Sequence, residues 1–123
     1  MKTILIAEDE KSLRTILKNE LDNASYNILE AKDGVEALAI LKSQTVDLLI
    51  LDVTMPGISG TKVAEMVQKS EDINPKPEII ILSNRDDFSA VADTLAAGAF
   101  TYWVKTDTPI EKIVEEVNKK LKV

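Results

Sequence analysis

The sequence predicts an α/β fold in which helices cover both faces of a parallel sheet. Short apolar runs alternate with longer segments whose apolar residues recur at helical spacing. The short runs are continuously apolar, which is typical of strands that are buried on both faces of a parallel sheet. Five such strand–helix units follow one another, so we expect a single (βα)5 domain over the 123 residues.

The expected strands are short. In chain order they cover residues 3–7, 27–31, 46–51, 78–82 and 100–104. Strand 46–51 has a nearly unbroken apolar composition, as expected for a central strand of the sheet. The sequence shows no internal repeat and no low-complexity linker, so no separate output domain is expected within these residues.

The first two helices are each expected to turn an apolar stripe toward the sheet. In the first helix the stripe consists of Leu13, Ile16, Leu17 and Leu21. The second helix is expected to begin at Asp33, because Asp33 and Glu36 have the spacing of a capping box. The residues expected inside are Val35, Leu38 and Leu41.

Three further helices are expected, over residues 61–70, over residues 87–97 and from Thr108 onward. The loop 55–60 before the first of them contains two Gly and one Pro, which interrupt regular structure. The second is expected to stop at Gly98. The third has a strong start signal, with Pro109 at its first position. Its expected inner stripe is Ile110, Ile113, Val114, Val117 and Leu121.

The composition excludes several classes of site. The chain contains no Cys and no His. It therefore has no thiolate nucleophile, no disulfide, no Cys-based zinc site and no Ser-His-Asp triad. A bound metal would need oxygen ligands, which favours a hard cation such as Mg²⁺. The formal net charge of −6 argues against direct nucleic-acid binding, which requires a basic patch.

The N-terminal sequence indicates where the protein is found. The apolar run at residues 4–6 is too short for a signal peptide, and it is followed directly by acidic residues. No apolar stretch approaches the length needed to span a membrane. We therefore expect a cytoplasmic protein that does not associate with a membrane.

Candidate site residues directly follow four of the predicted strands. Glu8 and Asp9 follow the first, Asp52 the third, Ser83 the fourth and Lys105 the fifth. The carboxyl ends of parallel strands lie along one edge of the sheet, where ligands bind. Three carboxylates placed together repel one another, so they require a divalent cation and Lys105 for neutralisation. A carboxylate beside Mg²⁺ can attack a phosphoryl group, a transfer that depends on positioning and charge rather than on a His base.

Together these motifs resemble the receiver domains of two-component response regulators over the whole chain, residues 1–123. The matching segments are Glu8-Asp9, Asp52-Val-Thr-Met-Pro-Gly57, Ser83 and the run from Gly98 to Lys105. Each motif is weak alone, but all four occur in order at the ends of predicted strands. The resemblance implies a flavodoxin-like three-layer sandwich with strand order 2-1-3-4-5. It also implies a phosphorelay signalling module that catalyses only its own phosphorylation and dephosphorylation.

The resemblance assigns a role to each acidic residue. Asp52 is the expected phosphoacceptor. Asp9, Asp52 and the backbone carbonyl of Thr54 are the expected direct ligands of Mg²⁺, and Glu8 is expected to act through a water molecule. Lys105 is expected to pair with Asp52 and, after transfer, with the phosphoryl oxygens.

The resemblance also implies a switch and its partners. Ser83 is the expected switch hydroxyl, and Tyr102 is the aromatic residue whose rotamer follows it. They would change a surface formed by the fourth helix, the fifth strand and the last helix. The implied partners are a sensor histidine kinase or phosphotransfer protein and a downstream protein or output domain. The domain is expected to be a monomer or a phosphorylation-dependent dimer.

The sequence departs from the family pattern at two places. Thr106 stands where a Pro usually follows the lysine, and Asn84 stands where a small residue usually follows the hydroxyl. Two other functions are alternatives to a phosphorylation-switched receiver. A pseudo-receiver would serve as a phosphorylation-independent interaction module, but such domains have usually lost one site residue. An aspartyl-phosphate phosphatase would need an acid at the position of Thr54.

Overall fold

The computed structural model describes residues 1–22, 26–84, 101–105 and 109–121. Its five strands are all parallel and form one sheet in the order β2-β1-β3-β4-β5, which confirms the predicted order 2-1-3-4-5. The strands are β1 (Thr3–Ala7), β2 (Asn27–Ala31), β3 (Leu48–Asp52), β4 (Glu78–Ser83) and β5 (Thr101–Val104). Their bounds differ from the predicted ones mainly at β3, which begins at Leu48 instead of residue 46.

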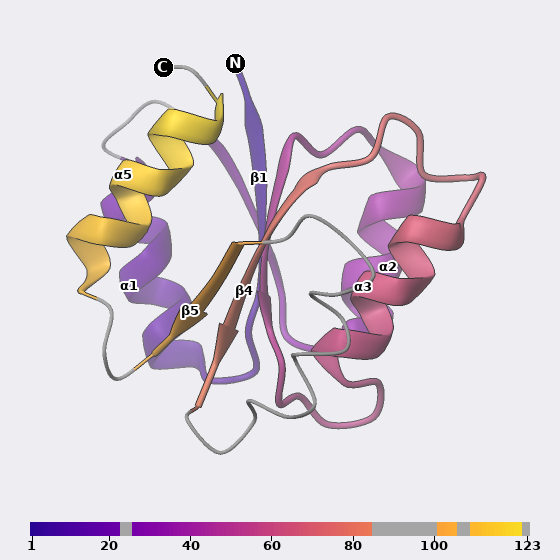
Figure 1. The fold of residues 1–123 in the computed structure, drawn as a ribbon, viewed down its shortest axis with the longest axis horizontal. Helices are drawn as coiled ribbons and strands as arrows, with labels where there is room; N and C mark the ends of the chain where they lie inside the picture. The colour runs from indigo at the N-terminus through magenta and orange to yellow at the C-terminus, as the bar shows by residue number, and fades with distance from the viewer. Residues whose placement is uncertain (23–25, 85–100, 106–108, 122–123) are drawn as a thin grey trace.

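Helices cover both faces of the sheet (Figure 1). On one face lie α1 (Lys11–Asp22) and α5 (Ile110–Leu121), and on the other lie α2 (Gly34–Ser43) and α3 (Gly60–Lys69). The helix predicted over residues 87–97 lies outside the described residues. In the described part of the chain, every helix is too short or too polar to span a lipid bilayer.

The continuous apolar runs are explained by two hydrophobic cores, one on each face of the sheet. Successive strand residues point to opposite faces, so both sets must be apolar. The strand residues buried in the core beneath α2 and α3 are Leu5, Ala7, Ala31, Leu49, Leu51, Ile79 and Ile81. The strand residues in the core beneath α1 and α5 are Ile4, Ile6, Leu48, Ile50, Ile80 and Leu82.

Two residues that were predicted to lie inside are exposed. Ile16 of α1 is 48% exposed, whereas Leu17 and Leu21 of the same helix are fully buried. Val35 of α2 is 64% exposed. The prediction for Val35 was wrong because the face of α2 that carries Ala37, Leu38 and Leu41 lies against the sheet. Val35 lies on the other side of the helix, toward solvent.

Side-chain caps fix where α2 and α3 begin. The Glu36 N–H donates to Asp33 Oδ1 at 2.8 Å, as the capping-box spacing predicts. The Glu36 carboxylate accepts from the Lys32 N–H at 3.4 Å, one residue before the position expected for a reciprocal box. Ser59 caps α3 in a similar way, accepting from the Lys62 N–H at 3.3 Å.

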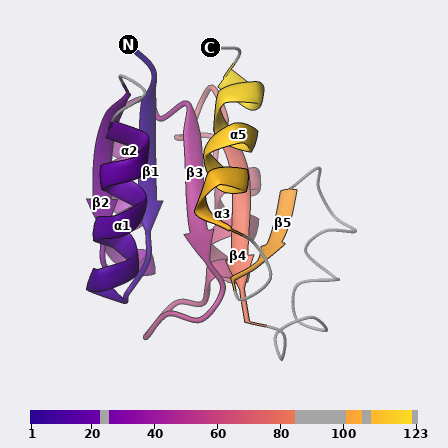
Figure 2. The ribbon, with the colours of Figure 1, turned by 90° about the vertical axis from the view of Figure 1, so that its left-hand side faces the viewer.

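All five strands end at the same edge of the sheet, which we call the carboxyl edge (Figure 2). The chain enters β1 and leaves α5 at the opposite edge (Figure 1). The polar residues that follow the strands are therefore brought to one place, remote from both ends of the described chain.

The two neighbouring apolar residues of α1 give a matched test of the core. Leu17 is fully buried and Ile16 is 48% exposed. Leu17→Ala is expected to lower the free energy of unfolding by about 2–5 kcal/mol, because it leaves a cavity. Ile16→Ala is expected to change it by less than about 0.5 kcal/mol. Urea unfolding followed by circular dichroism measures both changes, and equal losses would contradict this packing of α1.

Candidate functional site

Three carboxylates lie together at the carboxyl edge. Glu8 and Asp9 follow β1, and Asp52 is the last residue of β3. One carboxylate oxygen from each lies within 4.8 Å of the others. Glu8 and Asp52 are each only 1% exposed, whereas Asp9 faces solvent. The neighbouring parallel strands β1 and β3 thus deliver the three acids to one point.

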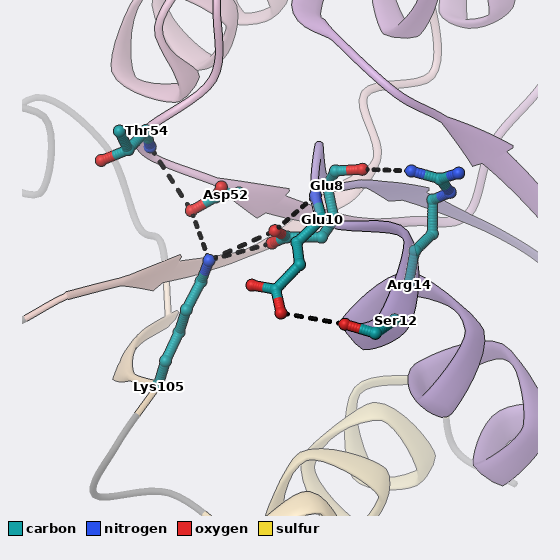
Figure 3. A network of polar contacts seen from close by, with 7 residues as sticks. All are labelled: Glu8, Glu10, Ser12, Arg14, Asp52, Thr54 and Lys105. Carbon is teal, nitrogen blue, oxygen red and sulfur yellow. Dashed lines mark hydrogen bonds and ion pairs between the residues drawn. The ribbon is translucent and has the colours of Figure 1, made fainter.

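Lys105 bridges the two buried acids (Figure 3). Its Nζ lies 3.0 Å from Asp52 Oδ1 and 3.1 Å from Glu8 Oε2. The Lys105 N–H also donates to the carbonyl of Ser83 at 2.8 Å, which fixes the end of β5 beside the end of β4. The ion pair between Lys105 and Asp52 was predicted, whereas the ion pair between Lys105 and Glu8 was not. We refer to Glu8, Asp9, Asp52 and Lys105 as the acidic site.

The acidic site carries an excess of negative charge. Three carboxylates and one ammonium group leave a formal charge of about −2 when all four are ionised. The available donors are oxygen atoms, and one of the acids is open to solvent. This donor set fits a hard divalent cation such as Mg²⁺, which binds through a few carboxylates and retains water ligands.

Burial shifts the pKa values of this group. The pKa of Asp52 is raised to about 7, mainly by burial; the hydrogen bond from Lys105 opposes this shift, and repulsion by Glu8 adds to it. Burial also raises the pKa of Glu8, although Lys105 opposes this change. Burial lowers the pKa of Lys105, but its hydrogen bond and charge interaction with Asp52, together with Glu8, outweigh this effect and raise the pKa.

The backbone after β3 packs closely around Asp52. The Thr54 N–H donates to Asp52 Oδ1 at 3.4 Å (Figure 3). The Gly60 N–H donates to the carbonyl of Val53 at 2.8 Å, so the start of α3 lies against the end of β3. A Cβ atom on Gly60 would lie 2.0 Å from the carbonyl oxygen of Asp52. Only glycine allows this approach, which helps to fix the backbone of Asp52.

Ser83 ends β4 beside the acidic site. Leu82 is opposite Asp52 in the pairing of β3 with β4, so Ser83 lies one residue beyond it toward the carboxyl edge. Ser83 is fully buried, and among the described residues its hydroxyl has no hydrogen-bond partner. A buried hydroxyl in this position can donate a hydrogen bond to an oxygen atom that enters the site.

Tyr102 lies on β5, opposite Ile81 of β4. It is half-buried and packs against the core beneath α2 and α3, whereas Trp103 packs against the core on the other face. The two side chains reach opposite cores because neighbouring residues of a strand point to opposite faces of the sheet.

Arg14 is a residue of the site's surroundings that was not predicted from the sequence. Its Nη1 donates to the backbone carbonyl of Glu8 at 2.7 Å, and its Nε lies 3.2 Å from Glu30 Oε1 (Figure 3 shows the first contact). One signal was available in the sequence. Arg14 belongs to the first turns of α1, where the helix dipole disfavours a cation, so a specific partner was to be expected.

The chain belongs to the response regulator receiver domain family, whose profile matches residues 4–118. Two curated relatives are the alkaline phosphatase synthesis transcriptional regulatory protein PhoP of Bacillus subtilis and the transcriptional regulatory protein AfsQ1 of Streptomyces coelicolor. PhoP is 31% identical over 121 residues, which cover 98% of this chain and 47% of PhoP. AfsQ1 is 32% identical over 105 residues, which cover 85% of this chain and 45% of AfsQ1. The chain thus spans less than half the length of these relatives.

Solved structures support the same family. The receiver domain of Francisella response regulator 1452 superposes with a TM-score of 0.86 at 26% identity, covering 99% of this chain and 98% of the other. The Vibrio cholerae chemotaxis protein CheY4 superposes with a TM-score of 0.83 at 26% identity, covering 97% and 98%. The chain is therefore a receiver domain of two-component regulatory systems, a signalling module rather than a metabolic enzyme.

The raised pKa of Asp52 predicts a pH-dependent loss of stability in metal-free protein. Unfolding returns the carboxyl to an ordinary pKa near 3.8, so between about pH 4 and pH 7 the unfolded state loses this proton while the native state keeps it. The native state is fully favoured below this window and is progressively penalised through it. Asp52→Asn removes the penalty.

Urea unfolding in EDTA across this pH range measures the difference. The Asp52→Asn variant is expected to exceed the natural protein by about 1–3 kcal/mol above pH 7, with the gap closing near pH 4. The variant Asp72→Asn changes an exposed acid at the other edge of the sheet and serves as the control. A stability difference for Asp52→Asn that stays constant from pH 4 to pH 8 would contradict the raised pKa.

Proposed function

We propose that this receiver domain is switched by transfer of a phosphoryl group to Asp52, with Mg²⁺ as cofactor. The observation that carries the proposal is the acidic site itself, where Lys105 lies 3.0 Å from Asp52 and 3.1 Å from Glu8 beside a third carboxylate. Clustered buried acids with one ammonium group suit a reaction that brings a cation and an anionic phosphoryl group together.

The chain's oxygen donors would hold the cation. Asp9 and Asp52 would bind it through their carboxylates and Thr54 through its backbone carbonyl, while Glu8 would act through a water molecule. When bound, Mg²⁺ supplies positive charge that neutralises the acids and orients the phosphoryl oxygens. It would also favour the ionised form of Asp52, whose pKa burial raises to about 7.

Asp52 would act as the nucleophile. A carboxylate oxygen forms a bond to phosphorus while the bond from phosphorus to the donor's imidazole nitrogen breaks, and the electron pair leaves with that nitrogen. The donor would be a phosphohistidine of a sensor kinase or of a phosphotransfer protein. Lys105 would compensate the charge on the transferred oxygens, and no general base is needed because the nucleophile is ionised.

The buried hydroxyl of Ser83 supports a switch. It would donate a hydrogen bond to a phosphoryl oxygen, and the aromatic ring of Tyr102 would follow its movement. This would shift an equilibrium between two arrangements of the surface formed by β5, α5 and the helix predicted over residues 87–97. The partner would be a downstream protein or an output domain in the cytoplasm, bound by a monomer or by a phosphorylation-dependent dimer, without direct contact to nucleic acid or membrane.

Intact mass spectrometry tests the phosphoacceptor. After incubation with acetyl phosphate and Mg²⁺, the natural protein is expected to gain one acid-stable, base-labile phosphoryl group. Asp52→Asn is expected to gain none, because an amide is not a nucleophile toward phosphorus. Asp72→Asn is the matched control and keeps the adduct. No adduct, or one that persists in Asp52→Asn, would refute the assignment and favour a phosphorylation-independent interaction module.

Mg²⁺ binding has its own test in thermal unfolding. At Mg²⁺ concentrations 100-fold above the dissociation constant, the natural protein is expected to gain about 2.7 kcal/mol of stability and a correspondingly higher Tm. Asp9→Asn is expected to lose most of this gain, because Asp9 would be a direct ligand. Asp72→Asn is expected to retain it. If Asp9→Asn gains as much as the natural protein does, Asp9 is not a ligand.

A further inference from the structure

The backbone of Glu8 is held from two sides. Its N–H donates to the carbonyl of Ala31, at the end of β2, at 3.1 Å. Its carbonyl accepts from Arg14 Nη1 at 2.7 Å. The Arg14 N–H donates to the carbonyl of Glu10, so the backbone hydrogen bonds of α1 start after Glu8. The Glu8 carbonyl lies before the helical hydrogen bonds begin, and it accepts its hydrogen bond from the Arg14 side chain instead.

Arg14 is itself fixed by β2. Its Nε lies 3.2 Å from Glu30 Oε1, and its side chain is only 15% exposed. Glu30 directly precedes Ala31, the residue that accepts from the Glu8 N–H. The planar guanidinium group can hold a carboxylate and a carbonyl at the same time in a defined orientation. Two neighbouring residues of β2 thus set the position of Glu8, one directly and one through Arg14.

We infer that Arg14 is a positioning residue for the acidic site. It fixes the direction in which the chain leaves β1, and hence where the carboxylates of Glu8 and Asp9 lie relative to Asp52. The Glu8 carboxylate also accepts from the Glu10 N–H at 3.2 Å, so the turn has little freedom once the Glu8 backbone is held. The inference rests on the proposed function and deepens it, since the positioned groups are the proposed cation ligands.

Lys18 provides a matched control for Arg14. It lies one turn further along α1, and its Nζ is 3.5 Å from Glu30 Oε2, the other oxygen of the same carboxylate. Its side chain is 43% exposed. Lys18→Ala therefore removes the same charge from the same helix and the same partner, without removing the hydrogen bond to the Glu8 carbonyl. Arg14→Lys keeps the charge but not the planar fork.

Amide hydrogen exchange in metal-free protein reads out the positioning directly. In Arg14→Ala, exchange at the N–H groups of Glu8 and Glu10 is expected to accelerate about tenfold, as for the loss of a charge-assisted hydrogen bond. Lys18→Ala is expected to leave both rates within about twofold, and Arg14→Lys to lie between. The N–H of Leu49, in the middle of β3, reports global opening and is expected to change less than these two in Arg14→Ala.

Calorimetric titration with Mg²⁺ provides the second measurement. Arg14→Ala is expected to bind Mg²⁺ about tenfold more weakly, as when a residue that orients metal ligands is removed. Lys18→Ala is expected to bind with nearly the natural affinity. The Mg²⁺ titrations are run at a temperature at which urea unfolding shows every variant to be folded, so that a loss of stability does not change the measured Mg²⁺ affinity.

Three results would overturn the inference. They are unchanged exchange at Glu8 and Glu10 in Arg14→Ala, equal effects in Lys18→Ala, and an equal acceleration at Leu49, which would assign Arg14 a purely structural role. Absence of Mg²⁺ binding by the natural protein would refute the proposed function instead. The exchange measurement in metal-free protein would still decide the role of Arg14.

Discussion

Repulsion among three carboxylates at one edge of the sheet is the constraint on which the rest of the site depends. Glu8 and Asp52 are buried, so water cannot screen them, and the energy of their charges rises steeply as solvent is removed. Among the described residues, Lys105 pairs with both of them and compensates part of their charge. Burial, with a smaller contribution from repulsion between the acids, raises the pKa of both Glu8 and Asp52. A cation held by the three carboxylates would relieve the repulsion that Lys105 leaves uncompensated.

The arrangement is maintained by parts of the fold that carry no charge. Parallel pairing brings the ends of β1, β3, β4 and β5 into line, so that residues far apart in the sequence meet. The glycine at position 60 lets the start of α3 lie against Asp52, and the two apolar cores hold the strands in register. The energy that opposes carboxylate repulsion thus comes largely from hydrophobic burial elsewhere in the domain.

The sequence was most informative where one local rule determines the outcome. Continuous apolar runs located the strands, and the residues after them were brought to the carboxyl edge, because parallel strands leave no other choice. Helix faces were predicted less well. Val35 and Ile16 have helical spacing, but which side of a helix is buried depends on how closely small residues such as Ala37 approach the sheet.

The remaining features of the site depend on tertiary contacts. One partner of Arg14 is a backbone carbonyl, which has no signature in a sequence, and the other, Glu30, lies on β2 and meets Arg14 only in the folded domain. The pKa of Asp52 depends on its burial and on its distance from Glu8. Neither the contacts of Arg14 nor the pKa of Asp52 can be obtained from residue types alone, although the helices and strands that carry these residues were predicted.

The position of the chain ends has a practical consequence. Met1 precedes β1 and Leu121 ends α5 at the edge of the sheet opposite the acidic site (Figure 1). A fluorescent protein fused next to either of these residues, or a tether to a sensor surface, would therefore extend away from the acidic site. An immobilised domain would keep its carboxyl edge facing the solution, so binding of a cation or a protein at the acidic site could be followed on a chip.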